Sequence, residues 1–261
     1  MDEKKGNGCC GGDVDNTGAT KTLSPAEVRA AVKDRYSAEA TEGGCCKPFR
    51  KHYTDDELSE IPSGADLGLG SGNPVALADI RPGERVLDLG CGGGVDVFLA
   101  AKRVGPKGRV IGVDMTDEMI ERSRENAKKG GFENVEFRLG LIESLPVEPR
   151  SIDLVISNCV VNLSPDKDSV FRSTFEALKP GGRFVISDIA FDSEPSSSLR
   201  TNLQAYCVCV AGADPLDGYL ERIKRAGFVN VELVSKTEAS PIEGEAALPL
   251  RVIIRARRPA A

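Results

Sequence analysis

Short apolar runs alternate with helix-like segments from Glu84 onward, and this alternation limits the fold more than any other feature. The runs ERVLDLG, RVIGVDM, VEFRLG, IDLVISN and GRFVISDI are apolar and rich in β-forming residues. Most are separated by stretches such as DVFLAAKRVG, DEMIERSRENAKKGG and SVFRSTFEALKPGG. Strands that alternate with helices indicate an α/β fold with a doubly wound, mostly parallel sheet. Nearly continuous hydrophobicity in the runs is typical of a sheet that is covered on both faces.

The segments on either side of this alternation predict further parts. Ser24, Pro25 and Glu27 form a typical helix start, and Thr54 caps a second short helix. A last β-run, RVIIRAR, follows the alternation. We therefore divide the chain into a disordered, Cys-containing tail (1–23), an N-terminal helical arm (24–64), the α/β domain (65–235) and a small C-terminal β extension (236–261).

The charge balance argues against nucleic acid as a partner. The net charge is −6 and the pI about 5.1, and no cluster of Lys and Arg runs along one face. The N-terminal stretch MDEKKGNGCCGGDVDNTGATK lacks the apolar core of a signal peptide. No run approaches the roughly 20 apolar residues of a membrane span. We therefore expect a cytoplasmic protein with no nucleic-acid or membrane partner.

Eight cysteines need an explanation in a chain of this kind. Intracellular thiols stay reduced, so a disulfide framework is disfavoured, and metal binding or catalysis is favoured instead. Their spacing matches no zinc pattern, because there is no Cys-x-x-Cys pair and His52 is the only histidine. A conventional zinc site is therefore not expected.

The stretch VLDLGCGGGVD places a glycine loop between a strand and a helix. Gly90 and Gly92 fit a dinucleotide fingerprint, but Val95 occupies its last glycine position, which argues against a pyrophosphate ligand. Asp114, at the end of the second strand, suits the two hydroxyls of a ribose. Asp88, beside the loop, suits an ammonium group better than a phosphate. Together these groups favour S-adenosylmethionine over the alternative of a plain turn.

Several motifs resemble those of known methyltransferases. VLDLGCGGG, GVDMTDEMIERSREN, RLGLIESLP and LKPGGRFVISD are similar to motifs of the class I S-adenosylmethionine-dependent, Rossmann-like enzymes. More narrowly, GVDMTDEMI, ISNCVVNLSPDK and CVAGA together resemble the arsenite methyltransferase family over roughly residues 25–235. The resemblance implies methyl transfer from S-adenosylmethionine to thiolate-bound trivalent arsenic (arsenite or methylarsenite), and thus arsenic detoxification.

The resemblance also implies which residues bind the cofactor. Asp88, Gly90 and Gly92 would line the methionine end of the cofactor, and Asp114 would bind the ribose. Met115, Ile142 and Glu143 would lie near the adenine, and Asn158 would face the cofactor from the fourth strand.

Cys159 follows a predicted strand directly, and ligands of open α/β sheets bind at the carboxyl ends of strands. It is therefore expected near the transferable methyl group. Trivalent arsenic is a soft centre that selects thiolates. Two or three thiolates would hold it in a pyramid with its lone pair free to accept the methyl group, and no general base is required. The task of the protein would be positioning.

The resemblance implies further thiols at this centre. Cys209, in CVAGA, would be the second arsenic ligand, and a third thiol, Cys45 or Cys46, would close over arsenic or reduce the pentavalent product. A reductant of the thioredoxin or glutathione type would complete the cycle. Cys207 is either an additional ligand or a packing residue, and the Cys9–Cys10 pair either chelates metal or has no role.

Two positions near these motifs need separate interpretations. Many relatives carry cysteine in the loop LGLGSGNP, where this chain has Ser71. Either Cys45 or Cys46 replaces that thiol, or the reaction stops after fewer methyl groups. Cys91 lies in the glycine loop, and we expect its side chain to point away from the cofactor and to serve packing.

Two other functions stay open at this point. The chain could methylate a different small molecule, such as a quinone, phenol or thiol, because the fold alone does not fix the substrate. It could also be a non-catalytic sensor that binds soft metals through its thiols. The oligomeric state and the acceptance of antimony are not encoded in any motif.

Overall fold

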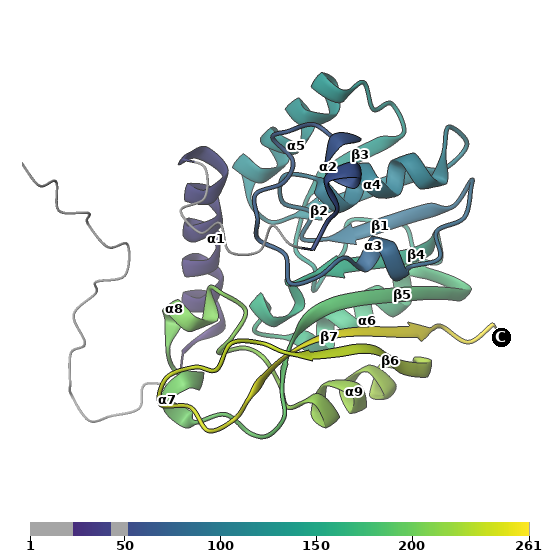
Figure 1. The fold of residues 1–261 in the computed structure, drawn as a ribbon. Coiled ribbons are helices and arrows are strands. Elements are labelled where there is room, and N and C mark those ends of the chain that lie inside the picture. Colours follow the sequence, from purple (N-terminus) through teal and green to yellow (C-terminus); the bar gives the residue numbers. More distant parts are fainter. Residues whose placement is uncertain (1–22, 43–51, 261) are drawn as a thin grey trace, which may run out of the picture.

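The computed structural model describes residues 23–42 and 52–260, and within them seven strands form one sheet in the order β3-β2-β1-β4-β5-β7-β6 (Figure 1). The first five strands in this order are parallel, and β7 is antiparallel to both β5 and β6. This confirms the predicted α/β fold with a mostly parallel sheet. The strands are β1 (Arg85–Leu89), β2 (Arg109–Asp114), β3 (Val135–Leu139), β4 (Ile152–Asn158), β5 (Leu178–Phe191), β6 (Val229–Glu238) and β7 (Pro249–Arg257).

The predicted C-terminal β-run is β7, and it lies between β5 and β6 in the same sheet. The boundary that the sequence analysis placed after residue 235 consequently falls inside β6. β7 pairs along most of its length with β5 on one side and with β6 on the other.

Helices cover both faces of the sheet (Figure 1). Consecutive residues of the central strands face opposite layers: Val86 packs with Phe98 of α4, whereas Leu87 belongs to the layer of Phe171 in α6. This double burial explains the continuous hydrophobicity of the strands. The longer helices are α1 (Pro25–Glu42), α4 (Val95–Val104), α5 (Asp117–Gly130), α6 (Lys167–Ala177) and α9 (Leu216–Arg225); the short ones are α2 (Asp55–Ser59), α3 (Pro74–Leu77), the 3₁₀ turn η1 (Val161–Leu163), α7 (Ser197–Arg200) and α8 (Leu203–Tyr206).

The two N-terminal helix starts are those that the sequence predicts. Before α1, the N–H of Glu27 donates to Ser24 Oγ (3.2 Å) and the N–H of Ser24 donates to Glu27 Oε2 (2.9 Å). Thr54 and Glu57 form the same reciprocal pair before α2, at 3.2 and 3.0 Å. Each pair satisfies backbone donors that the first turn of a helix leaves open.

α1 packs beside the start of α5 and beside η1, at the carboxyl edge of the parallel strands (Figure 1). Lys33 Nζ lies 2.9 Å from Asp117 Oδ2, and Ser37 Oγ donates to Glu118 at 2.8 Å. α1 therefore borders the region where ligands of such sheets bind. Within residues 23–42 and 52–260, no helix combines the length and the apolar character needed to span a membrane.

Candidate functional site

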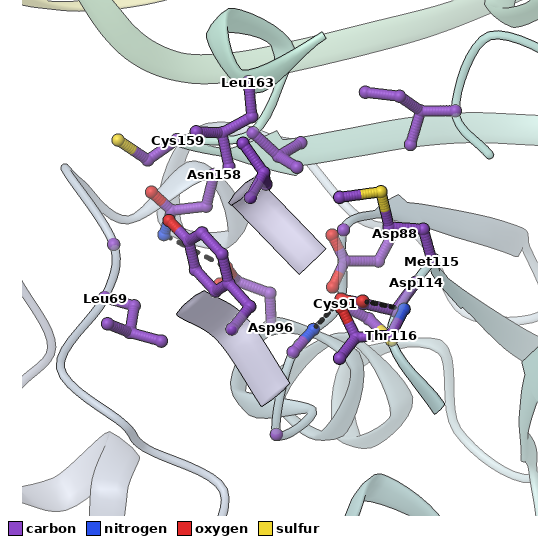
Figure 2. A pocket seen from close by; sticks show the side chains of 18 of the residues that line it. Leu69, Asp88, Cys91, Asp96, Asp114, Met115, Thr116, Asn158, Cys159 and Leu163 are labelled. Carbon is purple, nitrogen blue, oxygen red and sulfur yellow. Dashed lines mark hydrogen bonds between the residues drawn. The ribbon is translucent and has the colours of Figure 1, made fainter. Parts of the chain in front are cut away.

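A cavity that opens to solvent lies at the carboxyl ends of β1, β2 and β4, and its space, including part of this solvent, is about 1010 Å³ (Figure 2). Its walls are the glycine loop, the segment 65–70 and one side of α1. All eight residues that the sequence analysis assigned to the cofactor line it, and Cys159 does as well. These eight are Asp88, Gly90, Gly92, Asp114, Met115, Ile142, Glu143 and Asn158.

Asp114 fixes the glycine loop against the end of β2. The backbone N–H of Gly92 donates to Asp114 Oδ2 (3.0 Å), and that of Thr116 donates to Asp114 Oδ1 (2.9 Å) (Figure 2). Gly92 has φ +49°, in the left-handed region that glycine adopts without strain. Each carboxylate oxygen keeps a lone pair, so Asp114 shapes the loop and can still accept hydrogen bonds from a ligand.

Three buried carboxyl groups make this cavity strongly acidic. Asp88 is 2% exposed, Asp96 3% and Asp114 9%. Burial, followed by the negative charges of Asp96 and Asp114, raises the pKa of Asp88 well above its usual range. Burial likewise raises the pKa of Asp96 to about 6. A positively charged ligand would stabilise the ionised form of these groups, so the cavity suits a cation.

Asn158 connects β4 to the loop that covers the cavity. Its Nδ2 lies 2.8 Å from both Tyr53 Oη and the carbonyl oxygen of Gly72, and 3.1 Å from Asp96 Oδ2. Its Oδ1 accepts from the N–H of Ser71 at 2.9 Å. Tyr53 in turn donates to Asp96 Oδ1 at 2.9 Å. The amide is thus already engaged by protein groups, and Asn158 positions the loop as well as facing the cavity.

Sequence reasoning missed Tyr53 and Asp96 as part of this site. Asp96 is part of VLDLGCGGGVD, but the cofactor prediction used only the glycines and the aspartate before it. Tyr53 lies just before a helix cap, and no local motif marks it. They meet because the segment before α2 lies against the first turn of α4.

We expect Asn158→Ala to lower the free energy of unfolding by about 2–3 kcal/mol, since it leaves several buried partners without a hydrogen bond. Urea unfolding followed by circular dichroism measures the change. Asn202→Ala is the matched control, because it removes a single exposed helix cap and should cost about 1 kcal/mol. Equal losses in the two variants would contradict a central role for Asn158.

Glu143 ties α1 to the rim of the cavity. Its Oε1 lies 3.1 Å from Arg29 Nη2 and accepts from Ser164 Oγ at 2.9 Å. Glu143 was predicted to approach adenine. Glu143 does line the cavity, and its Oε1 is also bound by Arg29 of α1 and by Ser164 in the turn after η1.

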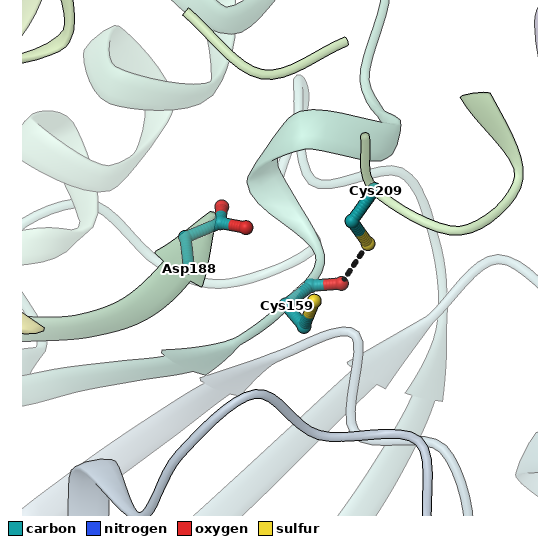
Figure 3. A group of neighbouring side chains, drawn as sticks. All are labelled: Cys159, Asp188 and Cys209. Atoms are coloured by element: carbon teal, nitrogen blue, oxygen red, sulfur yellow. Dashed lines mark hydrogen bonds between the residues drawn. The ribbon is translucent and has the colours of Figure 1, made fainter. Parts of the chain in front are cut away.

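Cys159 and Cys209 both line a second cavity that opens to solvent, and its space, including part of this solvent, is about 920 Å³. Cys209 Sγ donates to the carbonyl oxygen of Cys159 at 2.7 Å (Figure 3). Both residues have positive φ, +59° and +65°, a conformation that is uncommon for residues other than glycine and concentrates at functional sites. The hydrogen bond to Cys159 and burial raise the pKa of Cys209 well above its usual range. The apolar wall includes Leu69, Ile189, Val208, Val210 and Ile242.

The two cavities adjoin. Cys159 lines both of them, together with Tyr36 of α1 and the segment Leu69–Gly70. A group bound by the two thiols would therefore lie beside a ligand of the glycine loop. The sequence analysis expected Cys159 near the transferable methyl group, and the resemblance implied Cys209 as the second arsenic ligand.

The remaining described cysteines do not line the thiol cavity, although Cys91 lines the acidic cavity with the rest of the glycine loop. Cys207 packs with Val28 and Val32 of α1 and lines neither cavity, so its position agrees with the packing alternative. Cys91 is 5% exposed, and its sulfur lies against Gly112 of β2, where an added Cβ would be only 2.8 Å away. Cys45 and Cys46, like Cys9 and Cys10, lie outside the described residues.

Ser71 lines the thiol cavity. It is 3% exposed, and its Oγ lies 3.2 Å from Ser187 Oγ. Among residues 23–42 and 52–260, Cys159 and Cys209 are the two thiols that line it.

Comparisons with known proteins agree with this geometry. Residues 80–246 match the model of the methyltransferase domain family. An arsenite methyltransferase from Halobacterium salinarum is 44% identical over 87% of this chain and 63% of its own length, and the human arsenite methyltransferase is 33% identical over 73% and 55%. The crystal structure of an arsenic(III) S-adenosylmethionine methyltransferase from Chlamydomonas reinhardtii has a TM-score of 0.68 at 32% identity and covers 91% of this chain and 75% of that one.

The chain spans less than two thirds of the length of these two curated relatives. The matched part nevertheless includes the glycine loop, the acidic strand ends and the segments of Cys159 and Cys209, which are the motifs on which the predicted resemblance rested. That resemblance is confirmed, and the chain belongs to the methyltransferase family, in the branch that contains the arsenite methyltransferases.

Proposed function

We propose that this protein transfers methyl groups from S-adenosylmethionine to trivalent arsenic bound by the thiolates of Cys159 and Cys209. The observation that carries the proposal is the place of Cys159, which lines both the acidic cavity and the thiol cavity. A thiol pair at the border of a cofactor-type cavity is the arrangement that such a transfer needs. The named activities of the relatives support the same substrate.

The acidic cavity fits S-adenosylmethionine by its charge and donor groups. Asp88 would face the ammonium or sulfonium charge, and Asp114 would accept hydrogen bonds from the ribose hydroxyls. Met115 and Ile142 supply apolar surface for the adenine. When bound, the cofactor supplies a methyl group on a positively charged sulfur.

The thiol cavity fits trivalent arsenic because soft centres select sulfur. Arsenite would exchange hydroxyl groups for the thiolates of Cys159 and Cys209: each As–S bond replaces an As–O bond, and each thiol proton leaves in water. We propose Cys45 or Cys46 as a third thiol, and a thioredoxin- or glutathione-type reductant that returns arsenic to the trivalent state. Apolar side chains around the pair would keep bulk water away from the arsenic lone pair.

The test is to incubate the full-length protein with S-adenosylmethionine, arsenite and a thiol reductant, and to separate the arsenic species by chromatography with elemental detection. We expect methylated arsenic from the wild-type protein. Cys209→Ser should reduce its formation about 10²-fold, because misplacing a bound reactant by about 1 Å can have such an effect.

Cys207→Ser is the matched control, since Cys207 comes from the same segment and lines neither cavity. It should retain methylation within about twofold. Cofactor binding without any arsenic methylation would contradict the proposal and favour an organic substrate such as a quinone, phenol or thiol.

A further inference from the structure

β5 carries a buried carboxylate, Asp188, to the thiol pair (Figure 3). Cys159 Sγ, Cys209 Sγ and a carboxylate oxygen of Asp188 all lie within 4.8 Å of one another. The side chains come from the end of β4, from β5 and from the loop after α8. Asp188 is 0% exposed and Cys209 2%, so the three donors converge in a largely enclosed place.

We propose that Cys159, Asp188 and Cys209 form a binding site for a divalent thiophilic cation of the Zn²⁺ or Cd²⁺ class. Zn²⁺ binds Cys sulfur at about 2.3 Å and Asp oxygen at about 2.0–2.2 Å, and sites with three protein ligands keep a fourth position open. With these bond lengths, two tetrahedral thiolates lie roughly 3.8 Å apart, a separation within the range that the cluster already spans. Water or an exogenous thiol could fill the fourth position from the thiol cavity.

Asp188 is held in place in the way that metal-binding carboxylates are. Its Oδ1 accepts from Asn162 Nδ2 and from the N–H of Ile189, both at 2.9 Å. Its Oδ2 accepts from Tyr219 Oη at 3.2 Å. Hydrogen bonds of this kind orient a carboxylate ligand and reduce the cost of fixing it when an ion binds. Oδ1 already accepts two hydrogen bonds, whereas Oδ2 accepts one and keeps a lone pair for a metal ion.

The carboxylate makes the site distinguish between two kinds of ion. Trivalent arsenic takes sulfur ligands, whereas Zn²⁺ and Cd²⁺ accept both thiolate and carboxylate. Asp188 therefore contributes to divalent cation binding and little to arsenic binding. An ion held there would occupy both thiolates and exclude arsenite. The cation site stands on the geometry alone, and only its competition with arsenite rests on the proposed function.

Spacing patterns along the chain could not reveal this site. A conventional zinc site was not expected, because the sequence has no Cys-x-x-Cys pair and His52 is its only histidine. That expectation concerns ligands that are close in sequence. Here the ligands come from three separate segments that the sheet brings together.

The experiment measures Zn²⁺ affinity by competition with a chromophoric chelator, without cofactor or arsenite and under anaerobic reducing conditions. The parent for this test is the full-length protein with Cys9→Ser, Cys10→Ser, Cys45→Ser and Cys46→Ser, so that these four thiols do not bind the metal. We expect one Zn²⁺ per chain, and we expect Asp188→Asn to weaken binding at least about tenfold. Arsenite affinity of the same variant should stay within about twofold. Cys207→Ser is the matched control and should bind Zn²⁺ as the parent protein does.

Unchanged Zn²⁺ affinity in Asp188→Asn, or an equal loss in Cys207→Ser, would overturn the proposal. If Asp188→Asn does not fold, X-ray absorption of the Zn²⁺-loaded parent decides instead. Two sulfur neighbours at about 2.3 Å together with oxygen neighbours support the site, and an all-sulfur shell overturns it. Because the readout needs no methyl transfer, failure of the proposed function would leave this result unaffected.

Discussion

Replacing Cys159 by serine should lower arsenite methylation by about 10²-fold or more and leave S-adenosylmethionine affinity within about twofold. Serine is close in size and can adopt the backbone conformation at φ +59° with similar strain, so the fold should persist. Its hydroxyl is a hard donor and does not replace a thiolate on trivalent arsenic. The lost group is the one thiol that lines both the acidic cavity and the thiol cavity in the described structure.

Two measurements are needed for this variant. Arsenic speciation gives the rate of methylation, and equilibrium dialysis with labelled S-adenosylmethionine gives the cofactor affinity. Cys207→Ser serves as the control for the general effect of removing a thiol near α1. Full methylation by Cys159→Ser would refute the role of this residue, and a parallel loss of cofactor affinity would place its effect in the acidic cavity instead.

Asp114→Asn should weaken S-adenosylmethionine binding by about 10- to 100-fold. Asp114 accepts hydrogen bonds from the N–H groups of Gly92 and Thr116 on its two oxygens. An amide offers one oxygen and one NH₂ group, so one of these buried donors would face another donor. Losing a hydrogen bond to a charged group costs about 1.5–3 kcal/mol, and here it would also loosen the glycine loop.

Asp117→Asn is the matched control for Asp114→Asn. It makes the same chemical change three residues further on, but Asp117 is exposed and pairs with Lys33 on the surface. We expect its cofactor affinity to match that of the wild-type protein within about twofold, since exposed ion pairs contribute little. Equilibrium dialysis compares both variants, and similar affinities for the two would show that Asp114 does not support the binding loop.

The fold was predictable because its determinants are local. Runs such as ERVLDLG and IDLVISN are buried on both faces, and this burial leaves a continuous apolar pattern in the sequence. The cofactor-type cavity was predictable for a related reason: Asp88, Asp114 and Asn158 lie at or near the ends of parallel strands, and those ends meet at one edge of the sheet. The place of β7 between β5 and β6 was not predictable, because pairing partners of an antiparallel strand are not encoded in its own residues.

The sequence by itself determined which residues form strands and where the glycine loop lies, and it placed Cys159 directly after one of these strands. Tertiary structure alone decided that Tyr53 and Asp96 hold Asn158, and that Asp188 reaches the sulfur atoms of Cys159 and Cys209. The physical reason is the range of the interactions. The burial of a strand or helix face is visible as a pattern of apolar residues along the chain. These clusters, in contrast, depend on packing between elements that are distant in sequence.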